Sequence, residues 1–486
     1  MSRSNNLRSD GFLIGIDIGT TSIKAGAFDI QSGQLDSIAT NNHSRNETGS
    51  EYDANDLWNN TLDVLEQVIR KLSDTNKISA IGVTGQMHGA VLYDSNDKVI
   101  EPIVSWQDKK RCDPSILELI NSIIGEEASQ SLGTSMACGF TGAILLWLKQ
   151  HDSKTFGEIY HFNLITDFIR AKLLGRNDYA TDQTNAFGTG LFNTLLNQWH
   201  HELVEKLQLP LNIFPQIHPA SDVAGTLSAE IAKLLHLKKE VPIVYGGGDN
   251  QMSMVGSGLI SPEAPALVNI GTAAQVSKVS RSFQMLPAID TRPFFENYFA
   301  LVGASLGGGG HYQKLKEELN LDYSTMNKRA ASVPPGAEGL YYCTGPSREN
   351  PNRQSGFFGN LTKINDSGYK ARAVMEGVLM DLYAPLNLVE HGKSQNTLIG
   401  SGKALQMSNI WSQIAADLLG RSVRITNTEN AVLGAALLAG IGIKKFNSLH
   451  DCHYAFKYEK EILPDDLKRR FYSEQFVKQW SEQAKQ

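Results

Sequence analysis

Apolar and polar positions alternate near the start of the chain. One face of the first extended run carries Phe12, Ile14, Ile16 and Ile18, and a second alternating run from Ser22 to Ala27 follows Gly19-Thr20-Thr21. A period of two indicates a half-buried strand, and two such runs joined by a short glycine-containing turn predict a β-hairpin. We therefore expect a hairpin over residues 12–29 with its tip at residues 19–21.

A helix and another strand are predicted after this hairpin. Apolar residues recur at helical spacing from Leu57 to Leu72, with Asp53 or Asn55 as the N-cap. The run from Ile78 to Gly85 is nearly all apolar or small, which is typical of a buried strand. Alternating strands and helices predict an α/β fold with a mixed sheet.

The pattern of the first hairpin returns in the middle of the chain. In "ALVNIGTAAQVSKV" (residues 266–279) an apolar run meets Ile270-Gly271-Thr272, with Asn269 in the place of Asp17. One short match can be accidental, but it agrees with the two domains of roughly 200 to 250 residues that a chain of 486 residues predicts. The boundary is expected near Val255 to Ala266, which is rich in glycine and proline.

Two further helices are predicted in the second half of the chain. The two halves are expected to touch each other across a cleft. In "LIGSGKALQMSNIWSQIAADLLG" a strand and a glycine turn precede a helix that ends at Gly420, and its apolar stripe carries Met407, Ile410, Trp411, Ile414 and Leu418. "AVLGAALLAG" (residues 431–440) predicts a close-packed helix of small residues.

Composition excludes several classes of function. Hydrophobic content of 41% with 20% charged residues is ordinary for a soluble protein, and no run reaches the roughly 18 apolar residues of a membrane span. The net charge of −6, with Lys109-Lys110-Arg111 as the longest basic cluster, argues against nucleic-acid binding. The four cysteines form no CxxC pair, so neither a zinc site nor a disulfide framework is predicted. The polar start of the chain has no apolar signal core, and a cytoplasmic location is expected.

The two Gly-Thr hairpin tips are candidates for phosphate binding. Gly19-Thr20 and Gly271-Thr272 would present fixed backbone N–H groups and hydroxyls, although each could be only a turn. Asp17 lies on a buried strand beside the first tip, and Mg²⁺ held through water would account for a carboxylate there. "GSGKAL" (residues 400–405) is no P-loop, because Ala404 stands where Ser or Thr must bind Mg²⁺. Its glycines fit backbone lying against an adenine, or only a strand-to-helix turn.

A carboxylate follows three glycines in "VPIVYGGGDNQM" (residues 241–252). Glycine lets another body approach the backbone closely, and Asp249 and Asn250 would face it. A carboxylate beside an incoming hydroxyl can accept its proton during attack on a phosphoryl group. The alternative is that Asp249 serves as a helix N-cap, and both can hold together.

Polar side chains also follow the strand at residues 78–85. Gln86, Met87 and His88 lie between two glycines, and Trp106-Gln107-Asp108 follows the next apolar run. A polyhydroxylated ligand needs several directional donors and acceptors beside an apolar face, which this set offers. A lone histidine is more often structural than functional.

Together these residues resemble the FGGY carbohydrate kinases, over about Leu13 to Ala439. "IGIDIGTTSIKAG" is similar to the first phosphate motif, "GGGDN" to the catalytic-aspartate motif, "VNIGT" to the second phosphate motif and "LIGSGKALQMSNIWSQIAADLLG" to the adenosine motif. The resemblance implies an α/β fold of two ribonuclease-H-like domains of the actin, hexokinase and Hsp70 type, each with a mixed sheet, and an active-site cleft between them. Residues 11–258 would bind sugar and carry the base, residues 259–486 would bind ATP, and residues 1–10 would form a polar tail.

The resemblance also implies roles for single residues. Asp249 would be the catalytic base, and Asp17 and Asp249 would bind Mg²⁺ through water. The sugar would contact Gln86, Met87, His88, Trp106, Gln107, Asp108 and Asn250. ATP and its phosphates would contact Gly19, Thr20, Thr21, Lys24, Gly271, Thr272, Gly307, Gly308, Gly309, Gly310, Gly400, Ser401, Gly402, Lys403 and Asn409.

Two stretches resemble sedoheptulokinases more than xylulokinases. Xylulokinases usually have Asn in place of Gln107, and "DQTNAFGTGLFNT" (residues 182–194) resembles the sedoheptulokinase pattern, whereas "GQMHG" is similar to both. Residues 109–111 carry one residue more than the family pattern, and residues 344–360 match a xylulokinase-type segment only loosely.

We therefore expect an ATP- and Mg²⁺-dependent kinase that converts sedoheptulose to sedoheptulose 7-phosphate at a terminal primary hydroxyl. D-Xylulose and ribulose are the alternative ketoses. A non-catalytic ATP-binding switch protein of the same fold group is the alternative from another class. Neither nucleic acid nor a membrane is expected as a partner, and the oligomeric state is open, with a homodimer as one candidate.

Overall fold

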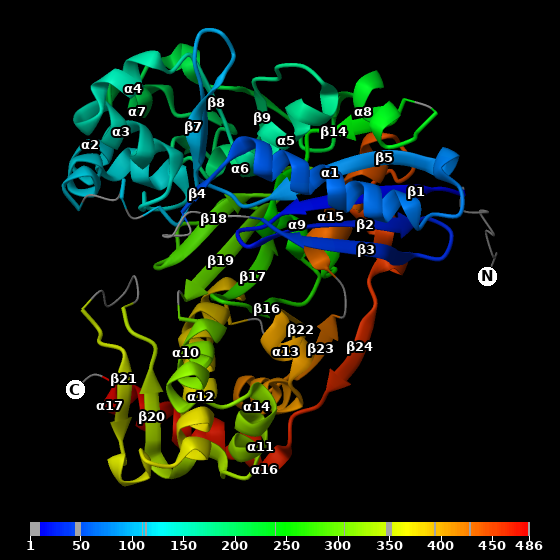
Figure 1. The fold of residues 1–486 in the computed structure, drawn as a ribbon. Coiled ribbons are helices and arrows are strands. Elements are labelled where there is room, and N and C mark those ends of the chain that lie inside the picture. The colour runs from blue at the N-terminus through cyan, green and yellow to red at the C-terminus, as the bar shows by residue number, and fades with distance from the viewer. Residues whose placement is uncertain are drawn as a thin grey trace.

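The fold consists of two α/β halves, each built on a seven-stranded sheet (Figure 1). The computed structural model describes residues 10–43, 50–108, 110–111, 114–238, 240–305, 307–346, 352–392, 395–426 and 429–484. Most of the polar N-terminal tail thus lies outside the described residues, as do Lys109 and Cys112. Both sheets mix parallel and antiparallel strands, so the predicted fold class is confirmed.

The first sheet has the strand order β13-β14-β5-β1-β2-β3, and β15 also pairs with β5. Its central strand β1 is antiparallel to β2 and parallel to β5, which confirms the predicted hairpin and the strand after it. The strands are β1 (Phe12–Ile18), β2 (Ser22–Asp29), β3 (Gln34–Asn42), β5 (Ile78–Gly85), β13 (Val223–Thr226), β14 (Pro242–Val244) and β15 (Gly247–Gly248).

The second sheet repeats this arrangement, in the order β18-β19-β17-β16-β22-β23-β24. Here β16 is antiparallel to β17 and parallel to β22, so the predicted second hairpin holds the same place as the first. The strands are β16 (Leu267–Ile270), β17 (Ala274–Ser280), β18 (Ile289–Pro293), β19 (Phe299–Ser305), β22 (Thr397–Ser401), β23 (Ser422–Thr426) and β24 (Tyr458–Ile462).

The halves meet through two helices, α9 (Asp249–Gly256) and α15 (Asn430–Gly442). The predicted helix of small residues is α15, and it packs directly on the first sheet (Figure 1). A Cβ at Gly82 would lie 2.1 Å from the carbonyl oxygen of Ala435, and a Cβ at Gly434 would lie 2.0 Å from that of Met252. Glycine at these positions therefore permits a contact between backbones that any larger residue would prevent.

The predicted helix caps are partly confirmed. The helix α1 (Ala54–Arg70) has Asp53 as its N-cap, with the side chain accepting a hydrogen bond from the Asp56 amide, so Asp53 rather than Asn55 starts it. The stripe predicted through Met407 was wrong. Ser408 caps a new helix, which divides the segment into α13 (Lys403–Met407) and α14 (Asn409–Leu419) and leaves Met407 82% exposed. Gly420, at φ +71°, ends α14 as predicted.

Smaller elements surround both sheets. A four-stranded sheet in the first half has the order β4-β7-β6-β8, and β9 pairs with β12, β10 with β11 and β20 with β21. These strands are β4 (Glu51–Tyr52), β6 (Ala90–Tyr93), β7 (Val99–Val104), β8 (His161–Asn163), β9 (Ala180–Asp182), β10 (Phe192–Asn193), β11 (Gln198–Trp199), β12 (Gln216–His218), β20 (Leu340–Cys343) and β21 (Gly356–Gly359). The remaining α-helices are α2 (Pro114–Leu132), α3 (Thr141–His151), α4 (Ser153–Glu158), α5 (Ile165–Leu174), α6 (Gln183–Phe187), α7 (His201–Lys206), α8 (Ala229–Leu234), α10 (Gly309–Leu319), α11 (Tyr323–Ala331), α12 (Ser367–Val389), α16 (Asp466–Phe471) and α17 (Val477–Gln483).

Three cysteines lie among the described residues. Cys138 is disulfide-bonded, whereas Cys343 and Cys452 are free and buried. One bonded cysteine does not make a disulfide framework, and spacing along the sequence could not predict this bond because it does not measure distance in the fold. Among the described residues, no helix has the length and apolar character needed to cross a membrane.

Candidate active site

Three glycines bring Asp249 to the junction of the two halves. Gly246 has φ +82°, and a Cβ there would lie 1.9 Å from the carbonyl oxygen of Val83, so only glycine lets the chain lie against β5. Gly247 and Gly248 then pair with the end of β5, and α9 begins at Asp249. The N-cap is Gly248, so the alternative of Asp249 as the N-cap was wrong. Asp249 instead occupies the first turn, where the helix dipole favours a negative charge.

Asp249 has a second carboxylate as its neighbour in space. Burial raises the pKa of Asp249 to about 6, against the lowering effects of the Asn250 amide and the Arg292 charge. Burial also raises the pKa of Asp17 to about 7, and repulsion from Asp249 adds to this. The Oδ1 atom of Asp17 is buried without a hydrogen-bond partner. Two adjacent carboxylates, one with a free oxygen, suit a hard cation.

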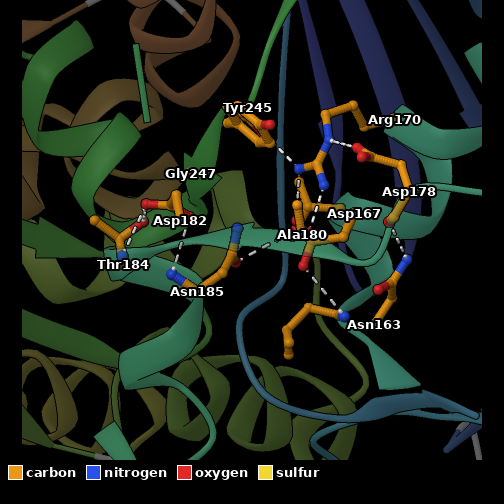
Figure 2. A network of polar contacts seen from close by, with 12 residues as sticks. Asn163, Asp167, Arg170, Asp178, Ala180, Asp182, Thr184, Asn185, Tyr245 and Gly247 are labelled. Carbon is orange, nitrogen blue, oxygen red and sulfur yellow. Dashed lines mark hydrogen bonds and ion pairs between the residues drawn. The ribbon is translucent and has the colours of Figure 1, made fainter. Parts of the chain in front are cut away.

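The backbone before Asp249 is held from two sides. The amide of Gly248 donates to Thr184 Oγ1 (2.8 Å), and the Thr184 hydroxyl donates to Asp182 Oδ2 (2.7 Å). From the other side, the Thr84 hydroxyl donates to the Gly247 carbonyl (2.7 Å). Figure 2 shows Asp182, Thr184 and Gly247 next to one another. This network fixes the two residues that precede the carboxylate.

A buried arginine, Arg170, holds the residue just before the three glycines. Arg170 donates from Nη1 to Asp167 Oδ1 (2.7 Å) and to the Tyr245 carbonyl (3.0 Å), and from Nε to Asp178 Oδ2 (2.9 Å) (Figure 2). Both Arg170 and Asp167 are 0% exposed. Tyr245 directly precedes the three glycines, so this ion pair anchors the start of the loop.

Predicted sugar and phosphate residues lie together at the tip of the first hairpin. Trp106, which is 40% exposed, donates from Nε1 to Thr20 Oγ1 (3.0 Å). The amide of Gln86 donates to the Ile18 carbonyl (2.9 Å), and its buried side chain bonds to the hydroxyls of Tyr52 and Ser105. Tyr52 in turn donates to the Thr20 carbonyl (3.1 Å). Gln86 therefore supports the tip from beneath.

His88 is held as a neutral ring. Its Nδ1 lies 2.5 Å from the Gly188 carbonyl, and the ring stacks on Phe140 at 4.1 Å between centroids. Burial lowers the pKa of His88 to about 4. Because a carbonyl only accepts, Nδ1 carries the proton and Nε2 remains an acceptor. Met87 packs against the glycines that precede Asp249, since a Cβ at Gly248 would lie 2.5 Å from Met87 Cγ.

The remaining predicted sugar residues have mixed surroundings. Asp108 is buried and pairs with Arg111 (3.1 Å), which also reaches Glu51 (3.0 Å). Asn250 donates from Nδ2 to Gln275 Oε1 on β17 (2.7 Å), which links the two halves at the site, and its Oδ1 is buried without a partner. Gln107 is partly exposed. Their contact with sugar stays a prediction.

The predicted nucleotide segments converge on the second hairpin tip. The amides of Gly309 and Gly310, in the first turn of α10, donate to the carbonyls of Gly271 (2.8 Å) and Thr272 (3.0 Å). A Cβ at Gly402, where φ is +87°, would lie 2.5 Å from the Ile270 carbonyl. Residues 307–310, 271–272 and 400–403 thus lie together in the second half.

Comparison with known proteins gives the family. Residues 12–256 match the N-terminal domain of the FGGY family of carbohydrate kinases, and residues 310–443 match its C-terminal domain. The chain belongs to the FGGY family of carbohydrate kinases. It is an ATP-dependent sugar kinase, so the alternative of a non-catalytic switch protein falls away.

Relatives and structures match over almost the whole of this FGGY kinase. It is 26% identical to the xylulose kinase of Staphylococcus xylosus, over 96% of this chain and 98% of that protein. It is 28% identical to the xylulose kinase of Escherichia coli strain K12, over 93% and 94%. The gluconate kinase structure from Lactobacillus acidophilus covers 98% of this chain and 97% of its own, with 22% identity and a TM-score of 0.87. That likeness shows the two-domain fold.

Some side chains that the FGGY resemblance assigns to ATP have protein partners. Lys24 pairs with Glu429 of the other half (2.5 Å), and Asn409 accepts from Lys460 (2.7 Å). The side chains of Thr21, Thr272 and Lys403 are exposed. The nucleotide contacts stay predictions, and Lys24 would have to exchange Glu429 for a phosphate.

Sequence reasoning missed three residues that lie around the candidate site: Arg170 and Thr184, which bond to the segment before Asp249, and Arg292, whose charge acts on Asp249. For Thr184 a local signal existed, because Asp182 is the N-cap of α6 and accepts the amides of Thr184 and Asn185. Nothing local indicated its bond to Gly248, which lies 64 residues away.

Thr184→Val is expected to lower kcat about 10-fold, because a shift of the loop displaces the carboxylate from the reacting hydroxyl. KM for ATP should not change. Steady-state kinetics checks this. Thr184→Ser, which keeps the hydroxyl, should restore turnover, and Thr61→Val removes a buried hydroxyl that bonds only within α1 as a matched control. Unchanged turnover in Thr184→Val would contradict the positioning role.

Proposed function

We propose that this kinase transfers the γ-phosphoryl group of ATP to the terminal primary hydroxyl of a ketose, with Asp249 as the general base. The observation that carries the proposal is the place of Asp249. It starts α9 at the junction of the halves, beside Asn250, which bonds to the second half, and above Met87, which adjoins His88. A carboxylate with a pKa of about 6 is mostly ionised near neutral pH and can still accept a proton.

The proposed step balances without further groups. The hydroxyl oxygen forms a bond to the γ-phosphorus, the bond from that phosphorus to the β-bridging oxygen breaks, and ADP leaves with its electron pair. The hydroxyl proton passes to a carboxylate oxygen of Asp249. Contact between the halves at Asn250 and Gln275 would help to exclude water, which otherwise competes as the acceptor.

Mg²⁺ fits the carboxylates of the site. The free Oδ1 of Asp17 and the carboxylate of Asp249 would hold it through water. The described residues contain no group of three or more His, Cys, Asp or Glu placed to hold a metal, so phosphate oxygens and water would complete its shell. When bound, Mg²⁺ neutralises charge on the β- and γ-phosphates.

Side chains of the first half fit a polyol. His88 offers an acceptor at Nε2, Asn250 a buried unpartnered oxygen, and the exposed ring of Trp106 an apolar surface for C–H groups. This combination of few directional polar groups and an apolar face is typical of small-molecule sites.

Sedoheptulose is our first candidate for the ketose. Gln107 and residues 182–194 support it through their resemblance to sedoheptulokinases. D-Xylulose is the second candidate, and the names of the relatives favour it, since those from S. xylosus and E. coli are both xylulose kinases. Both ketoses end in a primary hydroxyl, so the proposed step is the same.

A panel of ketoses with coupled detection of ADP tests the proposal. Sedoheptulose is expected to give the highest kcat/KM among sedoheptulose, D-xylulose and D-ribulose, because specificity is a difference in transition-state binding. The highest value with D-xylulose would establish the second candidate. ADP release that no ketose stimulates would overturn the proposal.

A further inference from the structure

An edge strand of the second sheet reaches the sugar side of the first half. The strand is β18, which lies beside α6 (Figure 1). Its Thr291 amide donates to the Gly133 carbonyl (2.7 Å), and Thr134 donates from Oγ1 to Asp290 Oδ1 (2.9 Å). At its end, Gln251 of α9 donates to the Pro293 carbonyl (3.2 Å). The strand is thus bonded to the first half along its length.

This strand places Arg292 close to the segments that carry the predicted sugar histidine and the predicted base, since Phe187 adjoins Gly188, which bonds to His88, and Pro293 bonds to Gln251, two residues after Asp249. Its guanidinium donates from Nη2 to Asp290 Oδ2 (2.9 Å) and lies 5.6 Å from the ring centroid of Phe187. Phe187 precedes Gly188, whose carbonyl holds His88. The charge of Arg292 acts on both neighbours, since it lowers the pKa values of Asp249 and of His88.

One nitrogen of Arg292 has no partner. The residue is 8% exposed, and its Nε is buried without a hydrogen bond. A buried donor that lacks an acceptor costs free energy, and arginine deprotonates in no accessible pH range, so the group needs an oxygen. Asp290 accepts a hydrogen bond from Nη2 and leaves Nε without an acceptor. Arg292 therefore has a buried Nε–H that a ligand oxygen could satisfy in the region of His88 and Asp249.

We propose that Arg292 is a sugar-binding residue supplied by the second half, whose Nε–H donates to an oxygen of the ketose bound between His88 and Asp249. The inference rests on the proposed function. It extends the sugar site, which the resemblance placed mainly in the first half, to a residue of the second. Because β18 belongs to the second sheet, bound sugar would link the two halves.

Direct binding of sedoheptulose and D-xylulose to the enzyme without ATP, measured by calorimetry, tests the inference independently of turnover. Arg292→Met is expected to weaken ketose binding about 10- to 100-fold, since the lost bond involves a charged donor. KM for ATP should not change. Guanidinium ion added to Arg292→Met should restore part of the ketose affinity, which a purely structural role would not allow.

Two further variants separate binding from support of the strand. Thr134→Val removes an anchor of β18 and leaves Arg292 in place, so ketose affinity should be retained. Arg281→Met removes an exposed arginine paired with Glu263 and serves as the matched control. If Arg292→Met does not fold, Arg292→Lys keeps the positive charge, and weaker ketose binding is again expected because the planar fork is lost.

The outcomes are distinct from those of the proposed function. The inference is overturned if the wild type and Arg292→Met bind ketose equally, or if neither binds it. It is also overturned if Thr134→Val loses as much ketose affinity as Arg292→Met. Failure of every ketose to be phosphorylated overturns the proposed function instead.

Discussion

Asp249→Asn is expected to lower kcat by about 10² to 10⁴-fold, the usual contribution of a positioned general base. Asparagine has nearly the same shape and cannot accept the hydroxyl proton. KM for the ketose and for ATP should stay near the wild-type values, because the lost function belongs to the transition state. Steady-state kinetics with the ketose that the panel identifies provides the measurement.

The stability of this variant separates lost catalysis from misfolding. Burial raises the pKa of Asp249, so the ionised carboxylate opposes folding above that pKa. A neutral amide removes this cost, and the Tm of Asp249→Asn should equal or exceed that of the wild type. Asp36→Asn, in an exposed position on β3, is the control and should change neither kcat nor Tm. Turnover close to wild type in Asp249→Asn would refute the assignment of the base.

The same raised pKa predicts the acid limb of the pH profile. The base must be deprotonated to act, and its pKa is about 6, so kcat/KM should rise with pH through about 6 and then level off. In Asp249→Asn the residual activity should lose this limb. A limb of wild-type shape in the variant would assign it to another group.

The elements that carry the site could be predicted from the sequence because their signals are local. The alternation around Gly19 and Gly271 gave both hairpins, and the apolar run from Ile78 to Gly85 gave β5 with the same ends. Gly420 was a reliable helix end, since αL backbone favours glycine. Ser408 was a local signal for the start of a new helix, since serine is a common N-cap. The apolar spacing around it suggested one continuous helix instead.

The partners of the site residues could not be predicted, because they are distant in sequence. Lys24 and Glu429 are 405 residues apart, and Thr184 and Gly248 are 64 apart. Resemblance to a family locates motifs along the sequence and assigns their side chains to ligands. It does not show that a side chain already has a protein partner, as Lys24 and Asp108 have. Arg292 lies outside the quoted motifs, so only the path of β18 brings it to the site.

Arg170→Met is expected to destabilise the folded protein by about 3 to 5 kcal/mol, because it leaves the buried carboxylate of Asp167 without its counter-charge. Arg170 also bonds to Asp178 and to the carbonyls of Ala180 and Tyr245, so the segment before the glycine loop loses its anchor (Figure 2). Chemical denaturation monitored by circular dichroism measures the loss. Arg70→Met, which removes an exposed arginine paired with Glu66 on α1, should unfold at the wild-type midpoint.

The pH dependence of this loss identifies its cause. Burial raises the pKa of Asp167 more than Arg170 lowers it, and removal of Arg170 should raise it further. A buried carboxyl whose pKa is higher in the folded than in the unfolded protein destabilises the fold less once it is protonated. The loss of unfolding free energy in Arg170→Met should therefore become smaller as the pH falls. Asp167→Leu combined with Arg170→Met should recover part of the stability at neutral pH, since an apolar pair needs no counter-charge. The guanidinium of Arg170 also packs on the Tyr245 ring, 4.8 Å from its centroid. If the loss of stability does not depend on pH and the double variant recovers none of it, the lost packing on this ring is the main cause instead.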